Sequence, residues 1–271
     1  IPLARGRSRS SSINKTINIA KDISRTNTKE IVLTGINIGD FGKGNNESFY
    51  DLIKQMDAHI DIERFRISSI EPNLLSDEII DFCFQSNKFM PHFHIPLQSG
   101  SNKMLRSMKR RYTSHDYSDR LNKIKSLDQD ACIGVDVIVG YPTESEKDFF
   151  ETYDFLKNHD VSYLHVFTYS ERENTKAIKL EPVVPYEERA RRSKILRDLS
   201  DQKRVNFYKR SVGQIRPVLV EKSKNGILFG YTDNYIKTRI QGPTSLENTI
   251  QNVFILDVKS GYVESEVVSV N

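Results

Sequence analysis

The sequence predicts an α/β protein in which a parallel barrel or partial barrel is followed by a small antiparallel β-barrel. Two observations indicate this fold: short apolar runs alternate with helical patterns as far as residue 182, and short β runs separated by turn signals follow residue 212. Alternating strands and helices predict βαβ units with right-handed crossovers. An open, doubly wound sheet is the alternative architecture for the first part.

The expected elements follow from periodicity and turn signals. Parallel strands are expected over 30–35, 64–69, 92–97, 132–140 and 163–169, with helices between them over 11–26, 47–57, 76–86, 114–127 and 145–158. The pattern of charged and apolar residues over 186–208 predicts one charged helix, with Ile195, Leu196 and Leu199 on a common face. The later β runs are 212–221, 227–232, 235–240, 250–258 and 262–268. Five short strands of this kind are typical of a small barrel, a shape often used to bind RNA.

Composition excludes several classes of protein. The 271 residues carry a net charge of +4, and no run approaches 18 apolar residues, so no membrane span is expected. Cys83 and Cys132 are the only cysteines, which excludes a disulfide scaffold and a self-contained cysteine-ligated metal cluster. They fit a reducing cytosol, so a cytoplasmic location is expected. Because the chain opens with Ile1 instead of Met, we expect that it begins inside a longer protein.

The basic residues gather in three clusters. These are Arg5, Arg7 and Arg9; Lys109, Arg110 and Arg111; and Arg189, Arg191, Arg192, Lys194 and Arg197. Each cluster alone is more often a solvated surface than a binding site. Three of them together make an anionic partner plausible, and RNA is the obvious candidate.

Candidate ligand-binding residues lie at or just past the expected strand ends, where the active site of such barrels is built. They are Gly35, Ile36, Asn37, Glu71, Gln98, Ser99, Asp136, Gly140 and Tyr169. Each of these motifs also has a purely structural interpretation, as a glycine-containing loop, a helix cap or a turn.

No metal ligands are expected within the chain. His92 and His94 alternate on an expected strand without a cysteine or acidic residue at metal-ligand spacing, so we interpret them as core or supporting residues. The sequence also lacks a Walker loop, a dinucleotide fingerprint and a nucleophile elbow.

The order of several segments resembles one family, the radical S-adenosylmethionine methylthiotransferases. The segments are Ile1–Gly6, Val32–Asn37, Ser68–Pro72, Pro96–Ser101, Ile138–Pro142 and Tyr169-Ser170. The resemblance implies a partial radical-SAM barrel with its connecting helix over 1–208, lacking its first strand. It also implies an RNA-binding TRAM barrel over 209–271. The likeness is greatest, including in Thr232–Lys237, to the branch that adds a methylthio group to adenine C2 of threonylcarbamoyladenosine, next to the anticodon of tRNA.

Two alternatives to this function stay open. One is a sister branch, which modifies isopentenyl-adenosine in tRNA or an aspartate of a ribosomal protein. The other is a non-catalytic RNA-binding protein with a TRAM barrel, although such a scaffold has no need to gather polar residues at strand ends.

The resemblance also implies cofactors and the residues that hold them. S-adenosylmethionine would meet Gly35, Ile36 and Asn37 at its amino end and Gln98 and Ser99 at its ribose or carboxylate. Glu71 and Asp136 would lie nearby, with Gly140 and Tyr169 near its adenine. Two [4Fe-4S] clusters are expected in the full-length parent; their cysteines are absent here, so this chain alone is expected to be inactive. Thr143 and Asn174 stand where the family usually has glycine, and the β-carbon of Thr143 puts the adenine contacts in question.

Transfer RNA is the expected partner, bound by a chain that acts as a monomer. The predicted contacts are Arg5, Arg7, Arg9, Lys109, Arg110, Arg111, Tyr231, Tyr235, Lys237 and Arg239. Phe229 and Tyr231 share one strand face by period two, as do Tyr235, Lys237 and Arg239 on the next run. Aromatic rings stack on unpaired bases and cations neutralise phosphates, although Phe229 could equally belong to the barrel core.

Overall fold

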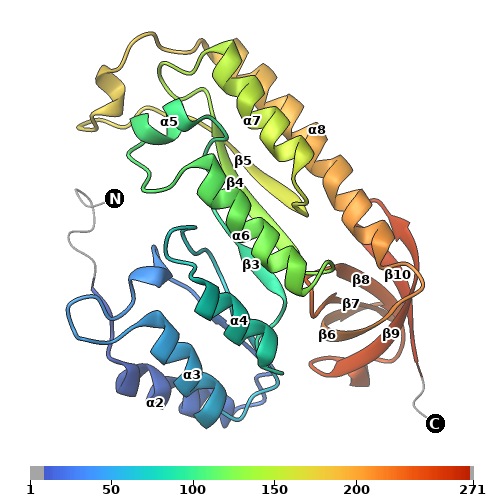
Figure 1. Cartoon of the computed structure of the whole chain (residues 1–271). Coiled ribbons are helices and arrows are strands. Elements are labelled where there is room, and N and C mark those ends of the chain that lie inside the picture. The colour runs from blue at the N-terminus through green and yellow to red at the C-terminus, as the bar shows by residue number, and fades with distance from the viewer. Residues whose placement is uncertain (1–8, 269–271) are drawn as a thin grey trace. The chain divides into compact units, whose positions relative to one another are not determined.

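A computed structural model describes residues 9–268, and the chain divides into two compact units (Figure 1). The first unit combines the residues up to Phe93 with those from Tyr208 onward, and the second unit is His94–Phe207. This grouping cuts the chain differently from the predicted division into 1–208 and 209–271, which stays a prediction. Each unit is described by itself.

The N-terminal part of the first unit is built from helices around one parallel strand pair. Its elements are α2 (Ile13–Ser24), β1 (Glu30–Leu33), η1 (Ile38–Asp40), α3 (Phe49–His59), β2 (Arg64–Ile67) and α4 (Asp77–Gln85). β1 pairs with β2 in parallel register from Glu30↔Arg64 to Leu33↔Ile67. Ser12, Ser48 and Ser76 each accept a hydrogen bond from a backbone N–H of the first helical turn, which fixes where α2, α3 and α4 begin.

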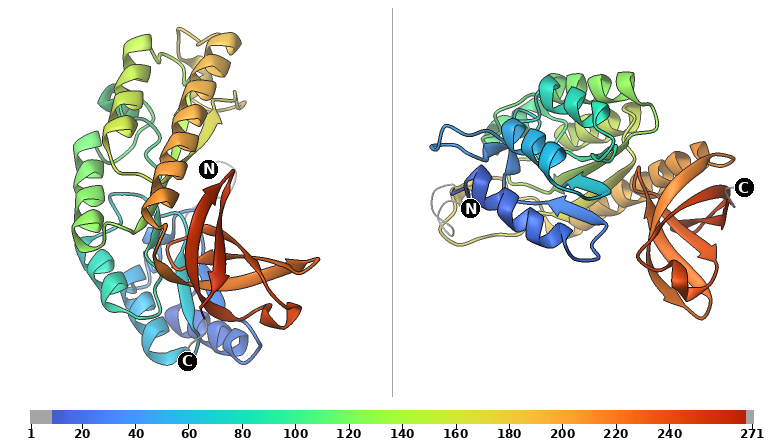
Figure 2. Two further views of the ribbon diagram at one scale, coloured as in Figure 1. Left: turned by 90° about the vertical axis from the view of Figure 1, so that its right-hand side faces the viewer. Right: turned by 90° about the horizontal axis from the view of Figure 1, so that it is seen from below.

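The C-terminal part of the first unit is a closed barrel with strand order β10-β8-β7-β6-β9 (Figure 2). The strands are β6 (Ile215–Lys224), β7 (Ile227–Thr232), β8 (Lys237–Gln241), β9 (Ile250–Lys259) and β10 (Tyr262–Val267). Val218, Val220, Leu228, Ile240 and Val253 fill its core. The expectation of a wholly antiparallel barrel is wrong at one place, because β8 and β10 pair in parallel where the barrel closes.

Two buried arginines explain why the first 93 residues group with the barrel. Arg64 donates to the backbone oxygens of Pro217 (2.8 Å) and Tyr231 (3.3 Å). Arg66 donates to the backbone oxygen of Asp233 (3.1 Å) and forms an ion pair with Glu30. Carbonyl oxygens at the edge of the barrel thus satisfy guanidinium groups that would otherwise be buried without partners.

The second unit packs helices against the sheet β3-β4-β5. Its elements are the end of β3 (His92–His94), α5 (Asn102–Ser107), α6 (Ser114–Leu127), β4 (Cys132–Val139), α7 (Glu146–Asn158), β5 (Tyr163–Thr168), η2 (Ala177–Lys179) and most of α8 (Tyr186–Arg210). β4 and β5 are parallel, from Gly134↔Tyr163 to Val139↔Thr168. Capping boxes at Thr113 and Ser145 start α6 and α7, and α7 and α8 run side by side (Figure 1).

Alternating burial distinguishes the two faces of this sheet. Val135, Val137 and Val139 of β4 are buried, whereas Asp136 and Ile138 between them are partly exposed. Side chains alternate between the faces of a strand. One face therefore belongs to the core, and the other is open.

The sequence placed these elements well, with two differences. The expected strands and long helices are all present, but the short helix α5 was not predicted, and the parallel strands form separate sheets of two and three strands. Within residues 9–268, no helix combines the length and the apolar character needed to cross a membrane.

Candidate functional site

A carboxylate flanked by two imidazoles stands on the open face of the β3-β4-β5 sheet. Asp136 Oδ1 lies 2.8 Å from His94 Nε2 and 3.3 Å from His165 Nδ1. The register places Asp136 directly opposite His165. In the sequence His94 has no acidic residue at metal-ligand spacing, and the prediction that it lacks an acidic partner is wrong, because adjacent strands bring residues from distant parts of the chain side by side.

The environment of Asp136 keeps it ionised. Burial acts to raise the pKa of its carboxyl, but the hydrogen bonds from His165 and His94 outweigh that effect and hold the pKa well below its usual range. The ligand atoms of His94, Asp136 and His165 lie within 4.8 Å of one another, a spacing that a metal ion could also use. No metal ligands were expected in this chain, and neither this trio nor His165 follows from the spacing of residues in the sequence.

Gln98 and Ser99 continue from β3 in an irregular segment. Gln98 has a positive φ of 66°, and its backbone N–H and C=O bond to Asp136 and Ile138 of β4. The hydroxyl of Ser99 is buried 3.0 Å from the hydroxyl of Thr152 on α7. Ser99 thus has an internal partner, and its role as a cofactor contact stays a prediction.

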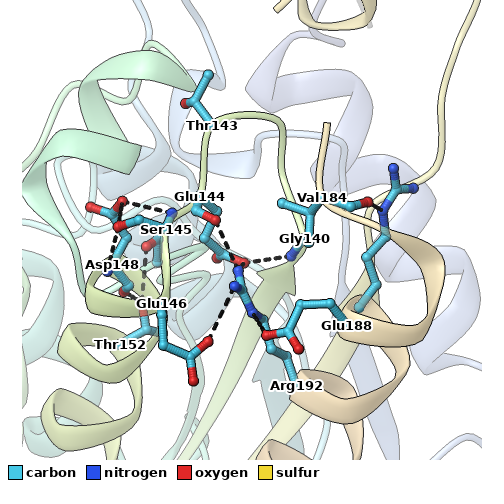
Figure 3. Close-up of polar contacts among 12 residues, drawn as sticks. Gly140, Thr143, Glu144, Ser145, Glu146, Asp148, Thr152, Val184, Glu188 and Arg192 are labelled. Carbon is cyan, nitrogen blue, oxygen red and sulfur yellow. Dashed lines mark hydrogen bonds and ion pairs between the residues drawn. The ribbon is translucent and has the colours of Figure 1, made fainter. Parts of the chain in front are cut away.

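Gly140 directly follows β4, in a conformation that requires glycine. Its φ is +75°, and a β-carbon there would lie 2.3 Å from Cγ of Arg189. Its backbone N–H donates to Glu144 Oε2 at 2.7 Å, so this group already has a partner (Figure 3). Any contact of Gly140 with a ligand must use its Cα or its carbonyl.

A buried ion pair holds the loop that follows Gly140. Glu144 Oε2 lies 2.7 Å from Arg192 Nη1, and both side chains are at most 5% exposed (Figure 3). Arg192 also donates to Glu188 and to the backbone oxygen of Glu144. Burial raises the pKa of Glu144 above its ordinary value, although the bonds from Gly140 and Arg192 act in the opposite direction.

The basic cluster on α8 is therefore largely neutralised inside the unit. Arg191 pairs with Glu146 and Glu188 at 2.7 Å, and Arg189 pairs with Glu171 at 2.6 Å. Their positions in the sequence suggested an RNA-binding surface, but in the structure Arg189, Arg191 and Arg192 are each bonded to glutamates.

Thr143 and Asn174, the two departures from the family pattern, both have positive φ, at 72° and 63°. The left-handed region favours glycine and tolerates asparagine, so Thr143 is the strained position of the two. Its N–H donates to the backbone oxygen of Pro182, which holds the loop in this conformation.

Tyr169 follows β5 and is tied to the end of β4. Its N–H donates to the backbone oxygen of Val139, and its own backbone oxygen accepts from Arg189 at 3.1 Å. Its ring packs edge-on against Tyr141. Its hydroxyl is buried and has no hydrogen-bond partner among the described residues. Such an orphaned hydroxyl is a natural contact for a ligand.

In the first unit, the predicted residues follow β1 and β2. Asn37 donates to Asp40 Oδ2 at 2.9 Å, while its own Oδ1 is buried without a partner in the described part of the chain. Gly35 and Ile36 are exposed. Glu71 is half-buried in the loop before α4, and its backbone oxygen accepts from Leu74.

The outer face of the barrel carries an aromatic and basic strip formed by Phe229, Tyr231, Lys237 and Arg239. Phe229 pairs with Arg239, and Tyr231 pairs with Lys237, across β7 and β8. The alternation with buried Leu228 places Phe229 outside the core, which decides against the alternative of a core residue. Lys237 is exposed, whereas Arg239 forms an ion pair with Glu264 at 2.6 Å.

Tyr235 does not continue this strip. It lies in the turn before β8, with a φ of 66°, instead of on the strand that the sequence predicted. Its ring stacks on His92 (4.1 Å between centroids) and on Tyr231 (4.7 Å), and the Arg66 guanidinium lies 5.0 Å from its centre. This packing argues against a base stacking on Tyr235.

The other predicted RNA contacts are scattered. Arg5 and Arg7 lie outside the described residues, and Arg9 is exposed. After α5, Lys109 and Arg111 are exposed and Arg110 is half-buried.

Comparison with known proteins adds to this geometry. Residues 2–156 match the Radical SAM superfamily and residues 209–268 match the TRAM domain. The chain is 40% identical over 98% of its length to threonylcarbamoyladenosine tRNA methylthiotransferase MtaB of Bacillus subtilis. It is 34% identical over 99% of its length to tRNA-2-methylthio-N(6)-dimethylallyladenosine synthase of Acetivibrio thermocellus. It covers 60% and 57% of those two proteins.

Among solved structures, the radical SAM enzyme coproporphyrinogen III oxidase (HemN) of Escherichia coli matches with a TM-score of 0.54 at 11% identity. The match covers 70% of this chain and 46% of that one. At this identity the match concerns the fold alone. Together these comparisons confirm the resemblance to radical S-adenosylmethionine methylthiotransferases that the sequence segments indicated.

Proposed function

Because this chain belongs to the Radical SAM superfamily, we propose that it is part of a tRNA methylthiotransferase acting on threonylcarbamoyladenosine. The observation that carries the proposal is the 40% identity, over nearly the whole chain, to a protein named for that activity. The order of a Radical SAM region and a TRAM region supports it. The sister activity on dimethylallyladenosine is the second candidate, since a protein so named is 34% identical.

Membership of the superfamily implies S-adenosylmethionine and an iron–sulfur cluster, which together supply radical chemistry when bound. Two buried orphaned atoms support a cofactor role for predicted residues. Asn37 Oδ1 can accept from an ammonium group, and the hydroxyl of Tyr169 can bond to a purine edge. We propose that Gly35, Ile36, Glu71, Gln98, Ser99, Asp136 and Gly140 contribute as the resemblance implies.

The cysteines of this chain do not fit a cluster site. Burial raises the pKa of the Cys83 thiol, and Cys132 is also buried. Cluster ligands are thiolates, usually four of them. We therefore propose that any clusters, two in the full-length protein, take their ligands from outside this chain. Anaerobic loading of the chain with iron and sulfide should then leave no stable four-iron cluster.

Nucleoside analysis tests the function directly. The gene that encodes this chain is deleted, and tRNA nucleosides are separated and identified by mass spectrometry. We expect methylthio-threonylcarbamoyladenosine to disappear and its unmethylthiolated precursor to accumulate. Loss of the methylthio group from the dimethylallyl nucleoside would identify the sister activity instead, and unchanged tRNA would overturn both.

A single-atom variant tests the cofactor contact. Tyr169→Phe in the full-length protein should weaken binding of S-adenosylmethionine in calorimetry without lowering stability, because the hydroxyl it removes has no partner in the described residues. Tyr186→Phe, on a tyrosine 76% exposed, is the matched control. Equal affinity of the two variants for S-adenosylmethionine would show that the Tyr169 hydroxyl does not contact the cofactor. The cytoplasmic location and monomeric state stay predictions.

A further inference from the structure

The Asp136 cluster joins one residue from each strand of the β3-β4-β5 sheet. His94 ends β3, Asp136 lies within β4 and His165 lies within β5. Their side chains are 14%, 22% and 52% exposed, so the cluster is accessible without being fully solvated. Residues that lie far apart in the chain thus converge at one point of a sheet, as the ligands of a metal ion commonly do.

The atoms that face one another in the cluster are the ones that a metal ion uses. Nε2 of His94 and Nδ1 of His165 both face Oδ1 of Asp136, at 2.8 and 3.3 Å, and the three atoms lie within 4.8 Å of one another. Zinc binds imidazole nitrogen and carboxylate oxygen at about 2.0–2.2 Å in a tetrahedron, which places neighbouring ligand atoms about 3.3 Å apart. The observed spacing is therefore close to that of a zinc site, and a small movement of the rings would complete it.

The charge of Asp136 also favours a cation. Within residues 9–268, its ion-pair partners are the two imidazoles, and neither a lysine nor an arginine lies within ion-pair distance of it. Neutral imidazoles donate hydrogen bonds to the carboxylate but leave its negative charge in place. A partly buried carboxylate is costly unless it is paired or coordinates a metal ion, and a divalent cation between the three side chains would neutralise it.

We propose that His94, Asp136 and His165 bind one divalent transition-metal ion, with Zn²⁺ as the expected occupant. Imidazole and carboxylate are ligands that zinc accepts, whereas magnesium and calcium prefer sites made of oxygen ligands. Three protein ligands leave a fourth position open to water or to another ligand. Because both imidazoles face Oδ1 of Asp136, Oδ2 remains available for the cofactor contact that the resemblance implies. The site does not depend on the proposed function, and it differs from the sequence expectation of no metal ligands in this chain.

Calorimetric titration with Zn²⁺ tests the site. The purified chain carries no histidine tag and is stripped of metal with a chelator beforehand. We expect one ion to bind per chain, with a heat that excess Mg²⁺ does not abolish, because magnesium prefers oxygen ligands. His165→Ala and Asp136→Asn should each weaken binding at least about 100-fold, since loss of a group that merely supports a ligand already costs about 10–100-fold. A wild-type chain that binds no Zn²⁺ would overturn the proposal.

His115→Ala is the matched control. His115 and Asp119 form an exposed histidine–aspartate pair (3.8 Å) on α6 of the same unit, and no third potential ligand joins this pair within the described residues. The control variant should leave the zinc affinity unchanged. Zinc binding that is lost in His115→Ala, or that survives in both His165→Ala and Asp136→Asn, would assign the ion to another part of the surface and overturn the site.

Cobalt spectroscopy identifies the ligands. Co²⁺ takes the place of Zn²⁺, and its visible absorption reports coordination by nitrogen and oxygen. The intense near-ultraviolet band of a cobalt–thiolate bond should be absent, because neither Cys83 nor Cys132 belongs to the cluster. A thiolate band would show that a cysteine binds the metal and would overturn the proposal. Circular dichroism checks that each variant is folded, and His165→Ala, which removes a half-exposed ring, carries the test if Asp136→Asn does not fold.

Discussion

Two basic regions look alike in the sequence and differ in the structure. On α8, Arg189, Arg191 and Arg192 are each bonded to glutamates, and Arg192 is buried with Glu144 (Figure 3). On the barrel, Lys237 is exposed beside the ring of Phe229. A cluster of cations in a sequence therefore indicates an anion-binding surface only where the structure shows that acidic residues do not already neutralise it. The counter-charges of the first region lie within the fold, whereas in the second region Lys237 is exposed and only Arg239 is paired, with Glu264.

The largest expected effect comes from the α8 region. Arg192→Met leaves the carboxylate of Glu144 buried without its cation, which should lower the free energy of unfolding by about 3–5 kcal/mol. Urea unfolding measures the change. Glu144→Gln combined with Arg192→Met should recover part of the loss, since the uncompensated charge is gone. A single variant as stable as the wild type would show that the pair contributes little.

Acid should destabilise the same unit through Asp148. Burial acts to raise the pKa of its carboxyl, but bonds from Lys103 and Ser145 lower it to about 2. A depressed pKa stabilises the fold above the unfolded value near 4, and this stability is lost as pH falls toward 2. The expected loss is about 2 kcal/mol. Asp148→Asn should flatten the profile between these pH values, and an unchanged profile would contradict this role.

The barrel strip should respond in RNA binding and not in stability. Lys237→Ala should weaken tRNA binding by about 1 kcal/mol and lower the salt slope by about 0.7–1. Arg239→Ala should have a smaller effect, because Glu264 already neutralises Arg239. Binding is measured across a salt titration. Equal slopes for wild type and both variants would place the RNA elsewhere.

The smallest effect is expected at Lys194. Its ion pair with Asp198, at 2.7 Å, lies on the exposed side of α8 with both side chains more than half exposed. Lys194→Ala should change the free energy of unfolding by no more than about 0.5 kcal/mol in urea unfolding. A loss comparable to that of Arg192→Met would mean that the exposure of a cation on this helix does not determine its contribution to the free energy of unfolding.

Much of the fold could be predicted because its signals are local. Serine and threonine caps precede the helices they start, and the apolar run with its flanking turn signals placed β7 at 227–232. Only the structure decided that Phe229 faces outward. The misses have non-local causes. Tyr235 left its predicted strand because stacking on His92 and Tyr231 fixes a turn there, and β10 pairs in parallel with β8 because the barrel must close.

The candidate site divides in the same way. The sequence by itself determined the positions of Asn37 and Tyr169 just past strand ends, since strand ends follow from apolar runs and glycines, and it placed Asp136 within the strand 132–140. Only the tertiary structure decided that Asp136 joins His94 and His165, and that Glu144 takes the charge of Arg192. The physical reason is that strand register and helix packing join residues far apart in the chain, and a charge or hydrogen bond acts through the distance between atoms.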